Sequence, residues 1–305
     1  MLRTGISFIF FQREMAPLQN IIVEKVLRQI EHLPTLPQVV MKILAMTDSE
    51  KINALDLSKE LDQSLSAKVL KVANSAYYGG RAARTVTSLH HAIMIIGFDM
   101  VKEIVLTASF FHTFKDSEEV EELKPLWTHS LGCALVAKRL AWVYRYETLD
   151  EAYLVGLIHD IGKLVIQQYF PEQYRLIQSR SNWGPESLKV EKEVLGMTHA
   201  QIAGRMAEQW NFHESLAEAI AHHHDEKWEL NPKLGRILFY ANRFVSGRVD
   251  FNRMLELFTQ AGMHFPLNWH LNELKRVEEI FHEEMNKASS LMNPPAAEEP
   301  PSGAV

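Results

Sequence analysis

The sequence predicts an all-α protein. Apolar residues recur at three- and four-residue intervals along nearly the whole chain, and no segment shows the two-residue alternation of a strand. No segment repeats at a fixed period, and 47% of the 305 residues are apolar against 23% charged, which is typical of a globular protein with a large core. We therefore expect short helices packed around a common interior.

The two ends of the chain are expected to lie outside this packed body. The apolar run from Ile6 to Phe11 is too short for a membrane span and no cleavage site follows it. We assign residues 1–19 to an extension whose real start could be Met15. Residues 291–305 are rich in proline and acid and predict a disordered tail, preceded by a C-terminal helical extension over 246–290. No other run approaches a membrane span, so we expect no membrane association.

The N-terminal half, residues 20–122, is predicted to consist of short packed helices. A glycine break at Gly79-Gly80 precedes Arg81 and Arg84, a pair that could bind an anion or an acidic partner, although most such pairs are simply solvated. The acidic segment 116–122 interrupts the pattern and predicts the boundary with the second half. The helical spacing covers 36–46, 54–61 and 67–77, followed by an apolar helical pair from His91 to Phe114.

The second half, residues 123–245, is predicted to be a helical bundle whose first helix starts near Trp127. One stripe of this helix places an imidazole among apolar neighbours, facing the core. We expect the cysteine of this stripe to pack as a small buried hydrophobe rather than to act as a ligand or nucleophile. The stripe consists of His129, Cys133, Ala137 and Leu140.

The next helix is predicted to form the centre of the bundle. Thr148 and Glu151 have the capping-box pattern, and the residues on to Val165 are apolar nearly all round. This helix would bury His159 beside Asp160. Because an unpaired carboxylate in apolar surroundings is strongly unfavourable, the pair needs a partner.

Two further helices direct histidines toward the same interior. A second capping-box pattern starts at Thr198 and puts His199 in line with an apolar stripe. The last helix, predicted over 215–225, carries His223 and His224 on or beside its inner face. Four helices thus each direct histidine or aspartate side chains at one interior, which is how bundle cores assemble metal sites.

The composition of 14 histidines and one cysteine agrees with such a site. Imidazole is the commonest metal ligand, whereas a lone cysteine excludes a disulfide framework and an all-thiolate zinc site. Each histidine also has an ordinary interpretation. A single one on an apolar face, such as His129 or His199, is more often a core residue bonded to a backbone carbonyl. The run 222–224 could be a solvated helix end, and His213 is expected at the surface.

Three segments of the sequence resemble the HDOD domain, a bacterial relative of the HD phosphohydrolases. They are Leu33 to Pro37, Val69 to Gly79 and Thr87 to Gly97, and the resemblance covers about residues 20 to 245. It implies an all-helical fold in which the N-terminal helices pack on an HD-like bundle. It also implies a role in signal transduction, because most HDOD domains look like degenerate HD sites.

The segment His159 to Lys163 matches the HD-containing motif of the related HD-GYP cyclic-dinucleotide phosphodiesterases. The Gly-Tyr-Pro of those enzymes is absent, since residues 226–229 read Glu-Lys-Trp-Glu, and Asn242 stands where the last aspartate of the HD pattern would fall. The metal ligands that the resemblance implies are His129, His159, Asp160, His199, His223 and His224.

The expected chemistry is that of one or two divalent transition-metal ions, iron or manganese before zinc or nickel, with Asp160 as a bridge. Such a pair clamps both the attacking and the leaving oxygen of a phosphoester and activates a bound water. Asp160 and Lys163 are the candidate catalytic residues, because Lys163 could hold a phosphate oxygen or protonate the leaving group. Lys163 could equally be a surface lysine at a helix end.

Two functions remain open. The first is a cytoplasmic signalling or regulatory protein with a metal-binding HD-like site, whose partners are signalling proteins or a nucleotide or cyclic-dinucleotide ligand. The second is a metal-dependent phosphohydrolase acting on a nucleotide or cyclic dinucleotide. Asn242 and the missing Gly-Tyr-Pro argue for reduced or absent activity. The net charge of −6 and the pI near 6.2 argue against direct nucleic-acid binding.

Overall fold

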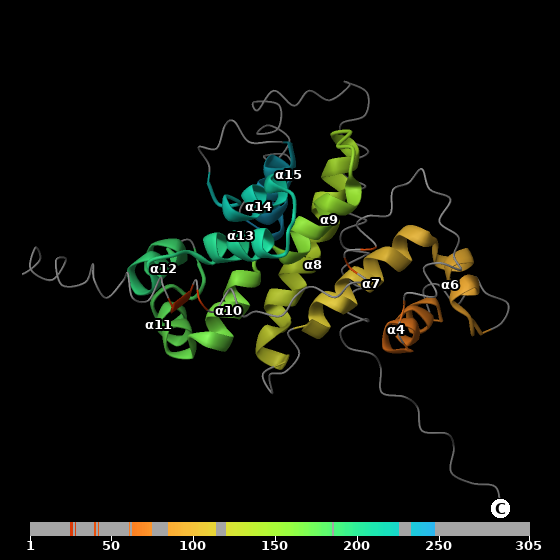
Figure 1. Cartoon of the computed structure of the whole chain (residues 1–305), viewed down its shortest axis with the longest axis horizontal. Helices are drawn as coiled ribbons and strands as arrows, with labels where there is room; N and C mark the ends of the chain where they lie inside the picture. Colours follow the sequence, from red (N-terminus) through yellow and green to blue (C-terminus); the bar gives the residue numbers. More distant parts are fainter. Residues whose placement is uncertain are drawn as a thin grey trace, which may run out of the picture. The chain divides into compact units, whose positions relative to one another are not determined.

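The computed structural model describes residues 61, 63–74, 85–113, 120–184, 186–225 and 233–247, together with 25, 26, 28, 40 and 42. Every regular element in these ranges is a helix, which confirms the all-α prediction (Figure 1). None of these helices combines the length and apolar character that a membrane crossing requires. Several predictions lie outside the described residues, wholly or almost wholly: the extension, the tail, the C-terminal helices, the first two N-terminal helices, and Arg81 with Arg84.

The described helices divide into two compact units, and the smaller contains α4 (Gln63–Ala73), α6 (Leu89–Ile96) and α7 (Phe98–Thr113) as far as His112. The Asn74 side chain joins the end of α4 to the segment before α6, because it donates to the carbonyl of Val86 and accepts from its N–H, both at 2.7 Å. Gly97, at φ 85°, separates α6 from α7, so the predicted apolar helical pair is confirmed.

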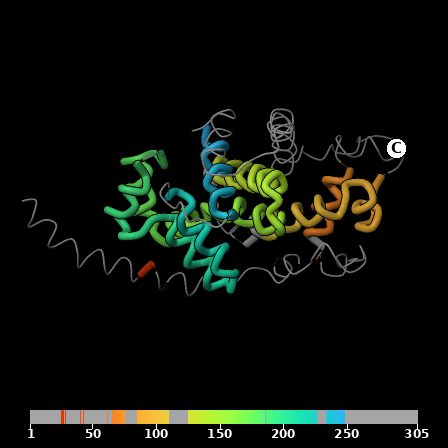
Figure 2. Tube along the Cα trace, turned by 90° about the horizontal axis from the view of Figure 1, so that it is seen from above, coloured from red at the N-terminus to blue at the C-terminus, as the bar shows by residue number. Residues whose placement is uncertain are grey.

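The larger unit is a bundle in which α9 is central. All residues from Ala152 to Ile158 are buried, and α9 contacts α8, α14 and α15. The helices α13 and α14 lie side by side (Figure 2). The eight described helices of this unit are α8 (Val120–Val143), α9 (Leu149–Ile158), α10 (Ile161–Tyr169), α11 (Pro171–Ser181), α12 (Ser187–Leu195), α13 (His199–Gln209), α14 (Glu214–Ala221) and α15 (Lys233–Val245).

Two glycines set the close helix contacts on which the site depends. A Cβ atom on Gly156 would lie 2.6 Å from Cα of Ala134, so the backbone of α9 rests directly on α8. A Cβ on Gly162 would overlap the carbonyl oxygen of His199 and lie 2.8 Å from its carbonyl carbon. The first turn of α10 therefore rests on the start of α13, and no side chain larger than hydrogen fits at either position.

The capping predictions have different outcomes. The box at Thr198 is confirmed, because its hydroxyl accepts from the N–H of Gln201 and the Gln201 side chain accepts from the N–H of Thr198. The box at Thr148 is wrong: Thr148 begins α9 without a side-chain bond. The carboxylate of Glu151 instead accepts a hydrogen bond from the Tyr146 hydroxyl at 2.9 Å, a partner that the capping pattern does not consider.

The central helix does not continue to Val165 as predicted. It ends at Ile158, His159 and Asp160 form a turn, and α10 begins at Ile161. The apolar pattern does not reveal this break. Ile161, Leu164 and Val165 are buried, as they would also be if the central helix continued through Asp160. The turn is stabilised instead by contacts that the side chain of Asp160 makes with other helices.

Candidate metal centre

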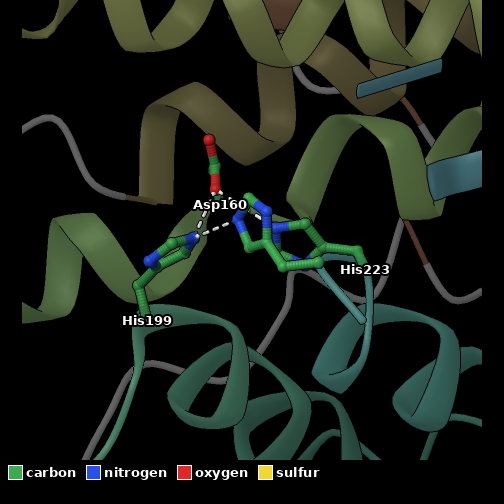
Figure 3. Close-up of side chains that lie close together, drawn as sticks. Asp160, His199 and His223 are labelled. Atoms are coloured by element: carbon green, nitrogen blue, oxygen red, sulfur yellow. Dashed lines mark hydrogen bonds and ion pairs between the residues drawn. The ribbon is translucent and has the colours of Figure 1, made fainter. Parts of the chain in front are cut away.

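Asp160 brings four imidazoles together at one carboxylate, which is 1% exposed. Its Oδ1 lies 3.1 Å from Nε2 of His199 and 3.6 Å from Nε2 of His223 (Figure 3). Its Oδ2 lies 3.4 Å from Nε2 of His159 and 3.5 Å from Nε2 of His129. Each carboxylate oxygen therefore faces two imidazoles, and the four rings come from α8, the end of α9, α13 and the turn after α14.

Three of these imidazoles are held through Nδ1. The Nδ1–H of His159 donates to the carbonyl of Gly156 at 2.8 Å, and that of His223 donates to the carbonyl of Ile220 at 2.7 Å. The Nδ1–H of His199 donates to the carboxylate of Glu191, with both oxygens at 2.8 Å. An imidazole that donates through Nδ1 presents the lone pair of Nε2, which is the usual arrangement of a histidine metal ligand.

Glu191 is a functional residue that our sequence analysis missed. It lies on α12, is 0% exposed, and also accepts the backbone N–H of His199 at 2.7 Å. The sequence could have indicated it, because Glu191 lies four residues from both Ser187 and Leu195, a spacing that puts all three on one helix face. In the structure all three are buried. A carboxylate on an inward face needs a partner, and here the partner is a histidine of the site.

Three buried atoms of the site have no hydrogen-bond partner among the described residues: Nε2 of His159, Oδ1 of Asp160 and Nε2 of His223. Leaving such atoms unsatisfied costs free energy, and native proteins rarely do so. All three are Lewis bases, so bound cations satisfy them whereas a hydrogen bond between them does not. The donor set therefore fits a divalent metal.

The donor atoms form two groups, and within each group they lie within 4.8 Å of one another. The His199 subsite comprises Asp160, His199, His223 and His224. The His129 subsite comprises His129, Cys133 and His159, with Oδ2 of Asp160 facing its two imidazoles. All six side chains predicted as ligands thus lie at one centre.

The helix predicted over 215–225 ends earlier, at Ala221. His223 and His224 therefore lie in the turn after α14 and not on its inner face. His222 is exposed, so only the first residue of the triplet is a solvated helix end, while His223 is 1% exposed. His213 is exposed as predicted and begins α14 by accepting the N–H of Ser215.

Lys163 belongs to the centre and is not a solvated surface lysine. Its Nζ lies 2.6 Å from Oδ2 of Asp160 and 5.8 Å from the centre of the Trp183 ring. The Lys163 side chain is 18% exposed against 1% for that of Asp160, so solvent reaches the lysine but not the carboxylate. Oδ2 of Asp160 therefore faces a fixed cation as well as the two imidazoles of the His129 subsite.

Asn242 is buried on α15 and reaches the His129 subsite. Its Oδ1 accepts from the Ser246 hydroxyl at 3.2 Å, and its side chain partly offsets the lowering of the His129 pKa by burial. The residue that stands where the HD pattern would have its last aspartate is therefore close to His129, one of the predicted ligands. It brings an amide in place of a negative charge.

The protonation states favour metal binding. Burial lowers the pKa of His129, His159 and His223, which keeps these rings neutral, the form that binds a metal. Burial by itself would raise the pKa of Asp160, but His159 and Lys163 beside it hold that pKa well below its usual range. The centre thus offers one carboxylate and several neutral imidazoles at neutral pH.

His199 differs from the other rings. Burial by itself would lower its pKa, but the carboxylate of Glu191 outweighs this and holds the pKa above the usual value. A metal must therefore compete with a proton at His199, and affinity at the His199 subsite falls as the pH decreases through that pKa.

Glu191→Gln is expected to reduce metal affinity by about 10- to 100-fold, because a neutral amide no longer supports the basicity and orientation of His199. A titration of the metal-free protein against a chromophoric chelator measures the change. The matched control is Glu193→Gln on the same helix, whose carboxylate pairs with Arg180 at the surface. Equal affinities for Glu191→Gln and the wild type would show that Glu191 does not tune the centre.

Comparisons with known proteins agree with this fold. The sequence profile of the HDOD domain matches residues 33–226. A "Putative phosphohydrolase" from Shewanella amazonensis SB2B is similar in structure, with a TM-score of 0.68 at 23% identity, over 87% of this chain and 97% of that one. A "Putative signal transduction protein" from Marinobacter aquaeolei VT8 gives a TM-score of 0.70 at 21% identity, over 90% of this chain and 65% of that one.

A curated relative, an "Uncharacterized protein" of Treponema pallidum (strain Nichols), is 24% identical over 238 residues. The match spans 74% of this chain but only 45% of the relative, so the chain matches less than half of that protein. The two solved structures are similar in fold alone, whereas the profile covers more than half of this sequence. On the profile match and the all-helical architecture together, the chain belongs to the HDOD domain family.

Proposed function

We propose that this protein is a signal-transduction protein whose larger unit holds a divalent transition metal at Asp160. The observation that carries the proposal is the set of three buried Lewis-basic atoms without a partner among the described residues, on His159, Asp160 and His223. Imidazole and carboxylate ligands suit iron or manganese, with zinc and nickel as alternatives. The two donor groups would hold one or two ions.

Burial favours a regulatory role over rapid turnover. His159, Asp160, His199 and His223 are each at most 1% exposed, so an ion held by them is enclosed by protein. The partly exposed members are His129, His224 and Lys163. Asn242 removes one negative charge from the His129 subsite, which weakens the hold on a second ion. We infer that the metal stabilises the bundle and that the protein transmits its signal to partner proteins or to a nucleotide ligand.

Metal analysis tests this function. The full chain, purified without chelator, is expected to contain a stoichiometric transition metal. Removing the metal should lower the melting temperature, and restoring it at 100 times its Kd should add about 2.7 kcal/mol of stability. A protein that contains no transition metal and gains no stability from added manganese, iron or zinc would contradict the proposal.

A metal-dependent phosphohydrolase is the second candidate, and the position of Lys163 favours it. A bound metal pair activates water and neutralises charge on a phosphoryl group. Lys163 is partly exposed and lies at the solvent side of Asp160, where its ammonium group can hold a phosphate oxygen or give a proton to the leaving oxygen. The same group binds Oδ2 of Asp160 until a substrate arrives.

The test for this activity is turnover of cyclic dinucleotides and simple phosphodiesters with added manganese or iron. If the protein is an enzyme, Asp160→Ala and Lys163→Ala should both lose most of the rate. Lys189→Ala, on the exposed face of α12, should keep it. Equal rates for wild type and Asp160→Ala would exclude catalysis at this centre and leave the regulatory function.

A further inference from the structure

The thiol of Cys133 faces the metal centre. Cys133 is 0% exposed, as our sequence analysis expected of a packed hydrophobe, but its Sγ lies 3.5 Å from Nε2 of His129. Sγ, the His129 nitrogen and the His159 nitrogen all lie within 4.8 Å of one another. The position of Cys133 one helical turn after His129 puts both side chains on the same inward face of α8.

We propose that Cys133 is a thiolate ligand of the metal ion in the His129 subsite, together with His129, His159 and Oδ2 of Asp160. This rests on the proposed metal-binding function and adds to it a sulfur ligand and the class of ion that this ligand prefers. A mixed sulfur, nitrogen and oxygen set of four ligands suits zinc or another thiophilic divalent ion.

The separations between donors fit a tetrahedral ion. Metal–nitrogen bonds of about 2.0 Å and metal–sulfur bonds of about 2.3 Å, at tetrahedral angles, place neighbouring donors about 3.3 to 3.6 Å apart. The observed separations are 3.5 Å from Sγ of Cys133 to Nε2 of His129, and 3.5 and 3.4 Å from Oδ2 of Asp160 to the nitrogens of His129 and His159. Three of the six donor separations thus match those around a tetrahedral ion.

An independent observation points to a ligand at the same place. Nε2 of His159 is fully buried and has no hydrogen-bond partner among the described residues. Its Nδ1–H is already donated to the Gly156 carbonyl, so Nε2 carries a lone pair that requires a donor or a cation. A cation in the His129 subsite supplies that partner.

Burial and the Asp160 carboxylate raise the pKa of the Cys133 thiol well above its usual value, so a bound cation is what would make it a thiolate. Asn242 provides no negative charge there, and Lys163 adds a positive charge 2.6 Å from Oδ2 of Asp160. A thiolate restores one negative charge next to the ion. The reaction is a proton exchange: the divalent ion binds sulfur, the S–H bond breaks, and the proton leaves to solvent. No oxidant or reductant is needed.

The experiment uses cobalt(II) as a spectroscopic probe in the full-length, metal-free protein. Because Cys133 is the only cysteine in the chain, any sulfur-to-cobalt charge-transfer absorption in the near ultraviolet must come from it. We expect this band in the wild type. Cys133→Ser should lose the band and about one bound cobalt, while keeping the ion of the His199 subsite. Glu193→Gln, at the surface of α12, should keep the band.

The outcomes separate this inference from the function on which it rests. Cobalt bound without a charge-transfer band overturns the role of Cys133 and leaves metal binding in place. Failure to bind cobalt, zinc or manganese at all overturns both. The Cys133→Ser protein need not fold for the inference to be tested, because the wild-type spectrum decides it.

Discussion

Gly162→Ala is expected to destabilise the protein by about 3 kcal/mol or more, although alanine is the better helix former by about 1 kcal/mol. The new Cβ would overlap the backbone carbonyl of His199, which no change of side-chain rotamer can relieve. Either α10 or α13 must move. Because the overlap with the backbone destabilises the fold by more than the higher helix propensity of alanine stabilises it, the free energy of unfolding decreases.

The same displacement should weaken metal binding. His199 is the first residue of α13, and its Nε2 lies 3.1 Å from Oδ1 of Asp160, two residues before Gly162. Separating the two helices pulls these donors apart. Thermal unfolding of the metal-free protein measures the first effect, and chelator competition measures the second.

The control is Gly184→Ala, in a partly exposed bend after α11, whose Cβ would lie 3.1 Å from one carbonyl oxygen, that of Ser181. We expect a much smaller change there. If Gly162→Ala were as stable as the wild type, the close packing of α10 on α13 would be wrong.

Asp160→Asn is expected to reduce bound metal from stoichiometric to trace amounts. The carboxylate faces four imidazoles and is shared by both subsites, so its loss affects every ion of the centre. We expect affinity to fall by more than about 100-fold, beyond the range for a residue that only supports a ligand. Elemental analysis and the metal-dependent shift in melting temperature measure it.

Asparagine has nearly the same shape as aspartate, so the packing around residue 160 is conserved. The substitution therefore tests how much the negative charge contributes to metal binding. Asp225→Asn, in the exposed segment after His224, removes the same charge nearby and should retain the metal. Full metal occupancy in Asp160→Asn would show that the imidazoles alone hold the ion, and would remove Asp160 as the bridge between subsites.

Much of the centre could be predicted from local sequence. His129 and His199 lie on apolar helix faces, and His159 with Asp160 lies in an apolar run, so burial of polar groups could be expected before any contact was known. Glu191 shows the limit of prediction from local sequence. Its helical spacing predicts a buried carboxylate, but the spacing does not predict that His199 is its partner. A partner distant in sequence is set by packing.

Local sequence by itself determined that this protein is helical, that the helix after Thr148 is central, and that His129, His159 and His199 face inward, because these features depend on periodicity within one helix. The break at Asp160 and the pairing of Glu191 with His199 were decided only by the tertiary structure. Each depends on how closely two backbones approach, which glycines such as Gly156 and Gly162 permit and which no single helix specifies.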